Sequence, residues 1–402
     1  KICYWPNAGD MTSGGVGVVD SMGDQSITSS TTSATLWASN FQRPGYGFAG
    51  WSDAYDYVVN QGSESNPDAH IYGPNEYITF TAGQYSATNG GLSLYAIWVE
   101  SEGYLQNWNG CSSLGQGKVT ALTDQRDGDV YAVAKLADGK CWMIENLRLD
   151  YDANFTESLS QGFGGQFIGL AQPEIANFQT TTANSLYYGG AQSGAASIDI
   201  GAGNVEGRMP RYRNDNTNTD SSINPNTVVA NMTSMNQNVY SYGNYYSWPA
   251  AVASTASFSL ADGTSVTTSL CPSGWRLPRG GNKTRIESYD DNDFWNLVVD
   301  SLNNGTQPSN YSSLSSPYYS GSEEASPVFI LIRKFPNNFT LSGYLEGQGT
   351  VVNYRGNYGS YHTSTTAGLN NYSIRFAIDM VSPGTTWANT GYGRSIRCVI
   401  DY

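Results

Sequence analysis

The sequence predicts a β-rich α+β protein that begins with a small module of short strands and continues into a larger domain with long loops. Three observations lead to this fold class. Short runs of β-branched and aromatic residues recur between Gly, Pro, Asn and Ser, as strands do in β-rich proteins. The chain has 402 residues, more than a single core usually holds. Apolar residues at clear helical spacing occur in one stretch, residues 291–305.

The first module is expected over residues 1–99, where four strand-like runs follow one another. They are SATLWA, GYGFAGW, EYITFT and LSLYAIWV, each bounded by turn-forming residues. The elements FQRPGYGFAGWS (41–52), YGPNEYITF (72–80) and LSLYAIW (92–98) resemble the Listeria–Bacteroides repeat. That family is a module of bacterial surface proteins, so the resemblance implies a β-grasp-like stalk or spacer. Residues 100–110 are expected to follow as a linker.

The second domain is expected over residues 111–402 and opens with a predicted β-hairpin. In DVYAVAKLADGKCWMIENLRL, two strand-like runs flank Asp138 and Gly139, a pair that favours a tight turn. Tracts rich in Asn, Thr, Ser and Gly fill residues 150–240. Such tracts bury too little apolar surface to hold regular structure, so they predict long surface loops.

Two more elements are predicted further along this domain. Residues 291–305 carry Asp or Asn at a capping position and then Phe294, Leu297 and Val298 at helical spacing, which predicts a helix. The run VFILI at 328–332 is short and wholly apolar, which predicts a buried strand. It is much too short to cross a bilayer, and membrane insertion is not expected.

Composition favours an extracellular protein. Charged residues make up 13% of the chain, about half the usual share, while Tyr (29) and Gly (45) are abundant. The net charge of −14 argues against a nucleic-acid partner. Five cysteines without a CxxC pattern suit disulfides in an oxidising compartment, although spacing alone leaves their pairing open. A start at Lys1 without Met suggests that targeting segments have been removed, so we expect a cell-surface location.

Four motifs in order carry a second resemblance. They are GKCWMIENLR (139–148), YGNYYSWPAAVA (242–253), SLCPSGWRLP (269–278) and YGRSIRCVIDY (392–402). Together they resemble the domain named for the major paralogous family of Fibrobacter succinogenes, which is similar to the C-type lectin fold. The resemblance implies that the terminal strands of the domain pair and that a long irregular region presents ligand-binding residues.

The same resemblance implies two disulfides. Cys271 and Cys398 lie in its two best-matching motifs, so a bond between them would hold the C-terminal strand to the core. Cys111 and Cys141 would then pair in the region of the opening hairpin. Cys3 is left over and is expected to be a small buried apolar residue.

Catalytic and metal-binding patterns are scarce in this chain. His70 and His362 are its only histidines, so we expect neither an enzyme nor a cofactor. Three acids at 290, 291 and 293 could ligate a cation, but helix capping explains them better. Calcium-dependent lectins use E-P-N or Q-P-D with a later W-N-D, and the nearest counterparts here are residues 172–174 and 387–389. A structural calcium ion and calcium-dependent sugar binding remain alternatives.

The run NYRGNYGSYHTSTTAGLNNYS, residues 353–373, is the predicted binding face. Tyr, Ser, Gly and Asn are the residues with which antibody loops contact a partner. Family relatives read R-G-x-x-G-x-Y-W-S-S-T here, and this chain departs from that frame at His362 and Thr363, which suggests that residue 362 faces outward or has been altered for contact. The predicted contact residues lie between frame positions. They are Asn357, Tyr358, Ser360, His362, Asn370, Asn371, Tyr372, Arg375, Asp379, Trp387, Asn389 and Tyr392.

The segment NYSIRFAID, residues 371–379, is predicted to be a strand with two unlike faces. Tyr372, Ile374, Phe376 and Ile378 would share a face that belongs to the core. The other face would be exposed, and it consists of Ser373, Arg375, Ala377 and Asp379. This arrangement would display contact residues on a rigid support.

These observations predict a non-enzymatic, cell-surface ligand-binding protein whose partner is a protein or glycan on another cell or on a phage. The chain also resembles the variable proteins of diversity-generating retroelements, in which Asn codons become Tyr, Ser, Thr, Asp or His. A fixed surface region with the Tyr and Asn bias of the whole chain is the alternative to diversification. A structural surface-layer or adhesive protein without a dedicated partner is the alternative to a dedicated binder.

Overall fold

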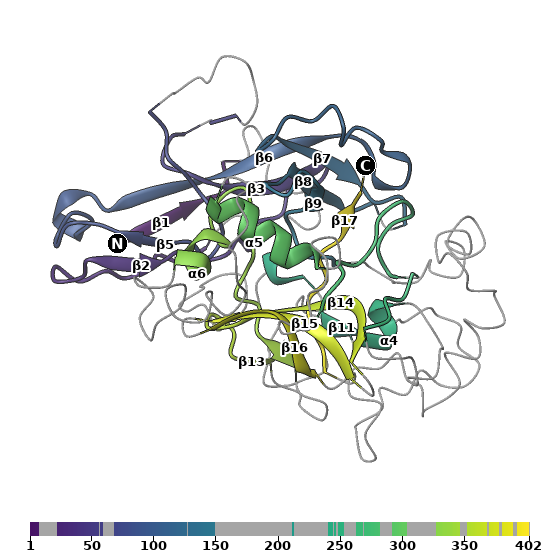
Figure 1. The fold of residues 1–402 in the computed structure, drawn as a ribbon. Coiled ribbons are helices and arrows are strands. Elements are labelled where there is room, and N and C mark those ends of the chain that lie inside the picture. Colours follow the sequence, from purple (N-terminus) through teal and green to yellow (C-terminus); the bar gives the residue numbers. More distant parts are fainter. Residues whose placement is uncertain are drawn as a thin grey trace, which may run out of the picture.

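The computed structural model confirms a β-rich α+β fold (Figure 1). An eight-stranded sheet, curled into a half-barrel, lies across one side of the molecule, and a three-stranded sheet lies on the other side. The structure describes residues 1–7, 22–55, 57–58, 68–126, 128–148, 211–212, 240–243, 245–246, 248–252, 263–267, 269–281, 292–303, 327–345, 352–367, 370–377, 380–388 and 392–401.

The four strands expected in the first module are present as β2 (Ser33–Thr35), β3 (Tyr46–Ser52), β5 (Tyr77–Thr79) and β6 (Leu92–Tyr104), with a 3₁₀ turn η1 (Ala87–Asn89) before β6. Two further strands, β1 (Ile2–Trp5) and β4 (Ile71–Tyr72), were not predicted. In the large sheet, β6 pairs antiparallel with β3 and parallel with β1, while β2 and β5 form a separate pair. Trp51 is fully buried in this core, where Tyr4, Phe41 and Phe48 surround its ring. Cys3 is a buried free thiol, as expected.

Strand β6 runs on through residues 100–104, which the sequence predicted to be a linker. Its burial alternates along these residues, and it pairs in parallel with β7 (Val119–Thr123) after pairing with β3. The prediction of a linker is therefore wrong for residues 100–104, which belong to the sheet. A short 3₁₀ turn, η2 (Leu105–Asn107), follows.

Buried polar groups tie the first module to the rest of the chain. The Glu145 carboxylate accepts hydrogen bonds from the backbone of Phe48 on β3 at 3.1 Å and of Ala132 on β8 (Val130–Lys135) at 2.7 Å. The two strands approach closely at Gly47, where a Cβ atom would come within 2.5 Å of the backbone nitrogen of Ala132. Asn75 accepts a hydrogen bond from the Leu341 backbone at 2.9 Å. The halves of the chain thus share a sheet and a hydrogen-bonded interface.

The predicted hairpin is confirmed as β8 (Val130–Lys135) and β9 (Cys141–Met143), with Lys135 opposite Cys141. The C-terminal strand β17 (Val399–Ile400) pairs antiparallel with β9 and closes one edge of the large sheet. The resemblance implied pairing between the terminal strands of the second domain. In the structure the last strand instead meets the second strand of the hairpin.

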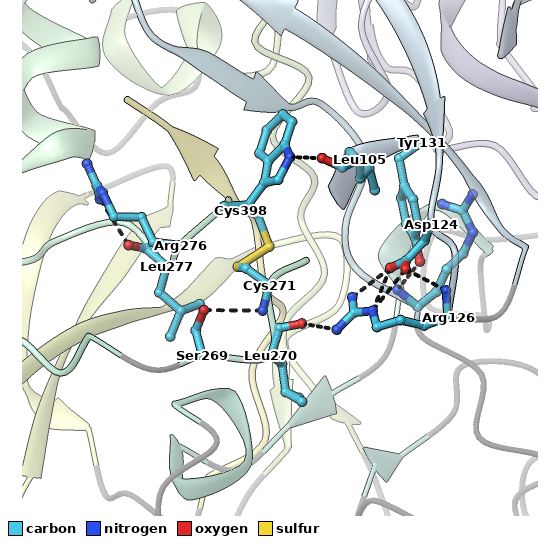
Figure 2. The surroundings of a disulfide bond; sticks show 12 residues. Leu105, Asp124, Arg126, Tyr131, Ser269, Leu270, Cys271, Arg276, Leu277 and Cys398 are labelled. Atoms are coloured by element: carbon cyan, nitrogen blue, oxygen red, sulfur yellow. Dashed lines mark hydrogen bonds and ion pairs between the residues drawn. A yellow bond between two sulfur atoms is a disulfide. The ribbon is translucent and has the colours of Figure 1, made fainter. Parts of the chain in front are cut away.

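Both implied disulfides are present. Cys111 bonds to Cys141 and Cys271 bonds to Cys398, with Cα atoms 5.8 and 5.7 Å apart. Figure 2 shows the second bond beside a buried ion pair, in which Arg126 contacts Asp124 and donates to the carbonyl of Leu270 at 2.6 Å. The C-terminal strand is therefore held covalently and by a polar anchor next to it.

The predicted helix is confirmed as α5 (Asp293–Asn303), and Asn292 caps it by accepting a hydrogen bond from the Trp295 backbone at 3.0 Å. The predicted strand at 328–332 is wrong, because Pro327–Leu331 form the short helix α6. Proline is well suited to a first helical turn, and a run of five apolar residues fits a buried helix as well as a strand. Figure 1 shows both helices between the two sheets.

The second sheet carries most of the predicted binding face. It consists of β14 (Gly359–Ala367), β15 (Asn370–Ala377) and β16 (Met380–Ala388), all antiparallel. Two small strand pairs accompany it, β12 (Tyr344–Leu345) with β13 (Val352–Asn353) and β10 (Arg211–Tyr212) with β11 (Tyr245–Tyr246). The remaining elements are η6 (Tyr240–Tyr242) and the helix α4 (Trp248–Ala251). No helix in the described ranges is long and apolar enough to span a membrane.

One core joins the two sheets. Phe294 and Leu297 of α5 pack in the same cluster as Trp142 of β9 on one side and Phe376 of β15 on the other. The rings of Phe294 and Phe376 stack with centroids 6.2 Å apart. The sheet that carries the predicted binding face is thus supported from beneath by the protein core.

Candidate functional site

Four tyrosine rings in contact with one another lie beside an arginine of β15, the central strand of the three-stranded sheet. Tyr344 stacks on Tyr354 and on Tyr392, with centroids 5.7 and 5.8 Å apart. Tyr354 meets Tyr358 edge to face at 4.7 Å. The guanidinium of Arg375 lies 5.7 Å from the ring centroid of Tyr344 and 5.4 Å from that of Tyr358. We call these five residues the Tyr–Arg patch.

The patch is open to solvent in part. Tyr354 is 51% exposed and is among the most exposed large hydrophobic side chains in the described part of the chain. The other four members of the patch are half-buried. Aromatic rings with this degree of exposure, held together by mutual contact, form a preordered surface that loses little entropy when a ligand binds.

A tight turn before β14 brings two of the rings together. Tyr354 follows β13 directly and has the left-handed φ of 58°, and Gly356 has φ 77°. The turn is fixed to its surroundings by hydrogen bonds from the Gly356 backbone to Leu341 (2.8 Å) and from the Gly343 backbone to Tyr358 (2.7 Å). The first of these bonds holds the turn to the segment before β12. The second joins the residue directly before β12 to the residue directly before β14.

Arg375 projects from β15 between two serines. Its cross-strand neighbours are Ser360 on β14 and Ser382 on β16. Within the described residues Arg375 forms no ion pair and donates no hydrogen bond, and its buried Nε atom lacks a partner. Its contacts are the faces of two tyrosine rings, which attract a cation but satisfy none of its N–H groups.

Two more arginines lie close to this position. Arg394 is buried and donates to the hydroxyl of Ser360 at 3.1 Å. Its burial, together with the nearby charge of Arg375, lowers the pKa of Arg394 to about 9. Arg355 follows Tyr354 in the turn and contacts the hydroxyl of Tyr245 at 3.2 Å. The patch is therefore locally basic in a chain whose net charge is −14.

The structure brings only part of the predicted contact set to the surface. Asn357 and Asn370 are exposed, and Tyr358, Arg375 and Tyr392 are half-buried. Asp379, Asn389 and the side chain of Trp387 lie outside the described residues. The remaining four predicted contacts are buried, and they are Ser360, His362, Asn371 and Tyr372.

The prediction that His362 faces outward is wrong. Its side chain is fully buried, with Nε2 2.6 Å from the carbonyl of Tyr246 and Nδ1 3.4 Å from the amide nitrogen of Asn371. A neutral imidazole that donates from Nε2 and accepts at Nδ1 satisfies both contacts. Burial, with a further contribution from Arg394, lowers the pKa of His362 to about 3. His362 is thus an internal polar link between β11, β14 and β15.

The strand predicted at residues 371–379 is present as β15, but only its predicted core-facing side is confirmed. Tyr372 and Phe376 of β15 are buried in the core, as expected. On the opposite face Ser373 and Ala377 are also buried, so the prediction of an exposed face is wrong for them. Among the described residues of that face, Arg375 alone keeps part of its surface in solvent, and Asp379 lies outside the described residues.

Sequence reasoning missed two members of the patch, Tyr344 and Tyr354. Tyr354 lies inside the polar run 353–373, and its place in that run was the available signal. Tyr344 lies ahead of the run, and only the pairing of β12 with β13, where Tyr344 is opposite Asn353, shows that it belongs to the same surface.

No metal centre is seen among the described residues, where no three His, Cys, Asp or Glu side chains are grouped to hold an ion. Asp293, one of the acids considered as a cation ligand, instead binds Lys140 and Arg276. The neighbouring residues 290 and 291 lie outside the described ranges, as do residues 172–174.

No family model, curated protein or solved structure matches this chain. The resemblances stated above therefore rest on the sequence alone, and the function is argued from the geometry of the patch.

Proposed function

We propose that this chain is a non-enzymatic, cell-surface ligand-binding protein and that the Tyr–Arg patch contacts the ligand. The observation that carries the proposal is a series of four tyrosine rings in contact, one of them 51% exposed, beside an arginine that has no hydrogen-bond partner among the described residues. Tyr and Arg are enriched among the residues that dominate binding energy at protein interfaces. The ligand would be a protein or glycan on another cell or on a phage.

The support beneath the patch agrees with this role. Recognition sites are commonly loops and edges held by a rigid scaffold. Here the scaffold is a three-stranded sheet backed by a core of α5 and β9, and two disulfides fix the neighbouring segments. Disulfides also suit an extracellular location.

Diversification of exposed residues in and near the patch is a second part of the proposal. Asn357, Tyr358, Asn370 and Tyr392 are candidate contact residues with exposed or half-buried side chains. If the gene belongs to a diversity-generating retroelement, a near-copy of its 3′ end that differs at adenines lies beside a reverse-transcriptase gene. Differences among copies would then concentrate at these four positions, because changes at buried positions would disturb the core.

The test of ligand binding compares single variants of the whole chain. Fluorescently labelled protein is titrated on a panel of intact bacterial cells and phage particles. Tyr354→Asn retains a residue that accepts left-handed φ, and Tyr358→Ala removes the adjoining ring. We expect at least a tenfold loss of binding for each, at an unchanged melting temperature. Tyr55→Ala, at a 64% exposed tyrosine of the first module, is the matched control and should bind normally.

Equal binding by all three variants would contradict the proposal and would favour a structural surface-layer or adhesive protein without a dedicated partner. Loss of binding together with a large drop in melting temperature would show that the rings are structural. Sequence differences among strains that scatter over the surface would argue against diversification.

A further inference from the structure

We propose that the Tyr–Arg patch recognises an acidic segment of a protein partner and that Arg375 binds one of its carboxylates. This inference rests on the proposed function, because it names the chemistry of the ligand for the same surface. It follows from the surroundings of Arg375, from the charge near it and from the way in which the tyrosine rings pack.

Among the described residues, Arg375 has no hydrogen-bond or ion-pair partner of the kind that a half-buried arginine normally has. In an antiparallel sheet a charged side chain is usually stabilised by an opposite charge on a neighbouring strand. The residues opposite Arg375 are Ser360 and Ser382, and no described carboxylate bonds to it. Arg375 is half-buried, and a carboxylate that binds its solvent-facing N–H groups would form charge-assisted hydrogen bonds without competing against a described acceptor.

The local field also favours an anion. Arg394 lies near enough to Arg375 to be affected by its charge, and Arg355 belongs to the adjoining turn. Like charges held close together repel, and an incoming negative group relieves that repulsion. The planar guanidinium matches a carboxylate with two parallel hydrogen bonds, which gives direction as well as attraction.

The packing of the rings favours a peptide over a sugar. A sugar ring binds on the open flat face of an aromatic side chain. Here Tyr344 stacks on two other tyrosines, and the guanidinium of Arg375 lies over Tyr344 and Tyr358. Much of the ring surface is therefore already covered, which leaves ring edges and hydroxyl groups for the ligand. Such groups suit the backbone and side chains of an extended acidic peptide.

The experiment measures binding of the full chain to three immobilised polymers, poly-L-glutamate, polygalacturonate and uncharged dextran. Arg375→Gln removes the charge at similar size, and Arg375→Lys retains the charge without the planar fork. Lys118→Gln replaces an exposed lysine directly before β7, which is not part of the patch. It makes the same change in net charge and serves as the control. Melting temperatures of all variants are recorded in parallel.

We expect poly-L-glutamate to bind the unmodified chain and the Lys118→Gln control equally. Arg375→Gln should weaken that binding at least tenfold, and Arg375→Lys should recover only part of it. Polygalacturonate should bind more weakly than poly-L-glutamate. The inference is overturned if poly-L-glutamate does not bind, if Arg375→Gln binds it as well as the control does, or if polygalacturonate binds more tightly and depends on Arg375.

The two proposals fail in different ways. If Tyr354→Asn abolishes binding to cells while Arg375→Gln retains it, the patch is a binding site and the acidic ligand is wrong. If Tyr354→Asn and Tyr358→Ala leave cell binding intact, the proposed function itself is wrong, whatever the polymers show.

Discussion

Some polar residues that composition would assign to the surface are buried in this protein. His362 belongs to a run of Tyr, Ser and Asn that looks like surface, yet its ring is buried between a backbone carbonyl and the amide of Asn371. The Nδ1 atom can accept from Asn371 only in the neutral form, whereas Nε2 donates to the Tyr246 carbonyl in either form. The result is an imidazole that resists protonation in the folded state.

This resistance predicts a loss of stability in acid. The pKa of His362 is about 3 in the folded protein, against 6.5 for an unburied histidine. Between these values the unfolded chain binds a proton that the folded chain does not, so the free energy of unfolding falls as the pH drops from 6.5 towards 3. The effect is on the order of a few kcal/mol. Urea unfolding of His362→Gln between pH 4 and 7 should show a flatter dependence on pH than the unmodified chain.

A buried carboxyl, Glu76, and a half-buried one, Asp138, act in the opposite sense. Burial raises the pKa of Glu76 and of Asp138 to about 7, so they contribute stability that is lost as the pH rises from about 4 towards 7. Comparing His362→Gln with the unmodified chain cancels their contribution. His70→Gln, at an exposed imidazole, is the matched control, and an equal slope for both variants would contradict the assignment to His362.

At the level of secondary structure, the tight fit between β14 and β15 depends on one glycine. Gly359 lies opposite Phe376, and a Cβ atom there would come within 1.9 Å of the phenyl ring. That ring stacks on Tyr361 and on Phe294, so it has little room to move. Gly359 is thus required where the sheet meets the core.

We expect Gly359→Ala to destabilise the fold by about 1–3 kcal/mol, because it overpacks a filled core. Chemical denaturation would measure the change. Gly103→Ala in β6 is the control, since a Cβ atom there would lie 3.9 Å from its nearest neighbour, a methyl group of Leu122. This control should change stability by less than about 0.5 kcal/mol. A similar effect of both variants would show that backbone freedom, rather than the Phe376 ring, decides the result.

The elements that the sequence predicted correctly are those with strong local signals. The hairpin at Asp138 and the helix after Asn292 combine turn or capping residues with clear periodicity. The run at 328–332 failed because a short apolar stretch does not distinguish a strand from a helix. The burial of His362, Asn371 and Ser373 depends on which distant segments pack on them, and a local pattern carries no such information.

The sequence predicted some residues of the candidate site and missed others. Tyr358, Arg375 and Tyr392 were among the expected contacts, and they are found together. Tyr344 joins them only because β12 pairs with β13. Register between strands that lie far apart in sequence decides which side chains share a surface, and the sequence does not show that register.

At the level of the whole molecule, the two disulfides close loops of very different size. Cys271 and Cys398 are 127 residues apart, whereas Cys111 and Cys141 are 30 apart. Cross-linking the unfolded chain at the first pair removes more conformational freedom. The chain-entropy relation gives about 5 kcal/mol for the larger loop and about 4 kcal/mol for the smaller one.

We therefore expect a double Ser variant at 271 and 398 to lower the melting temperature more than a double Ser variant at 111 and 141. The larger loop also joins the C-terminal strand to a buried ion pair at Asp124, so its loss should loosen that strand first. Calorimetry would measure the first effect, and hydrogen exchange at Val399 the second. An equal or reversed order of melting temperatures would contradict the loop-size argument.

Strand β6 has a mechanical consequence. Its partners β1 and β7 both run parallel to it, and β1 starts beside the start of β6. A pull that separates Lys1 from Tyr104 would slide β1 along β6, so that their hydrogen bonds break together and not one after another. We expect high unfolding forces in single-molecule pulling between these points, and a low, stepwise response would show that the ladder peels apart. A protein tethered through β1 and the end of β6 would therefore resist unfolding under tension.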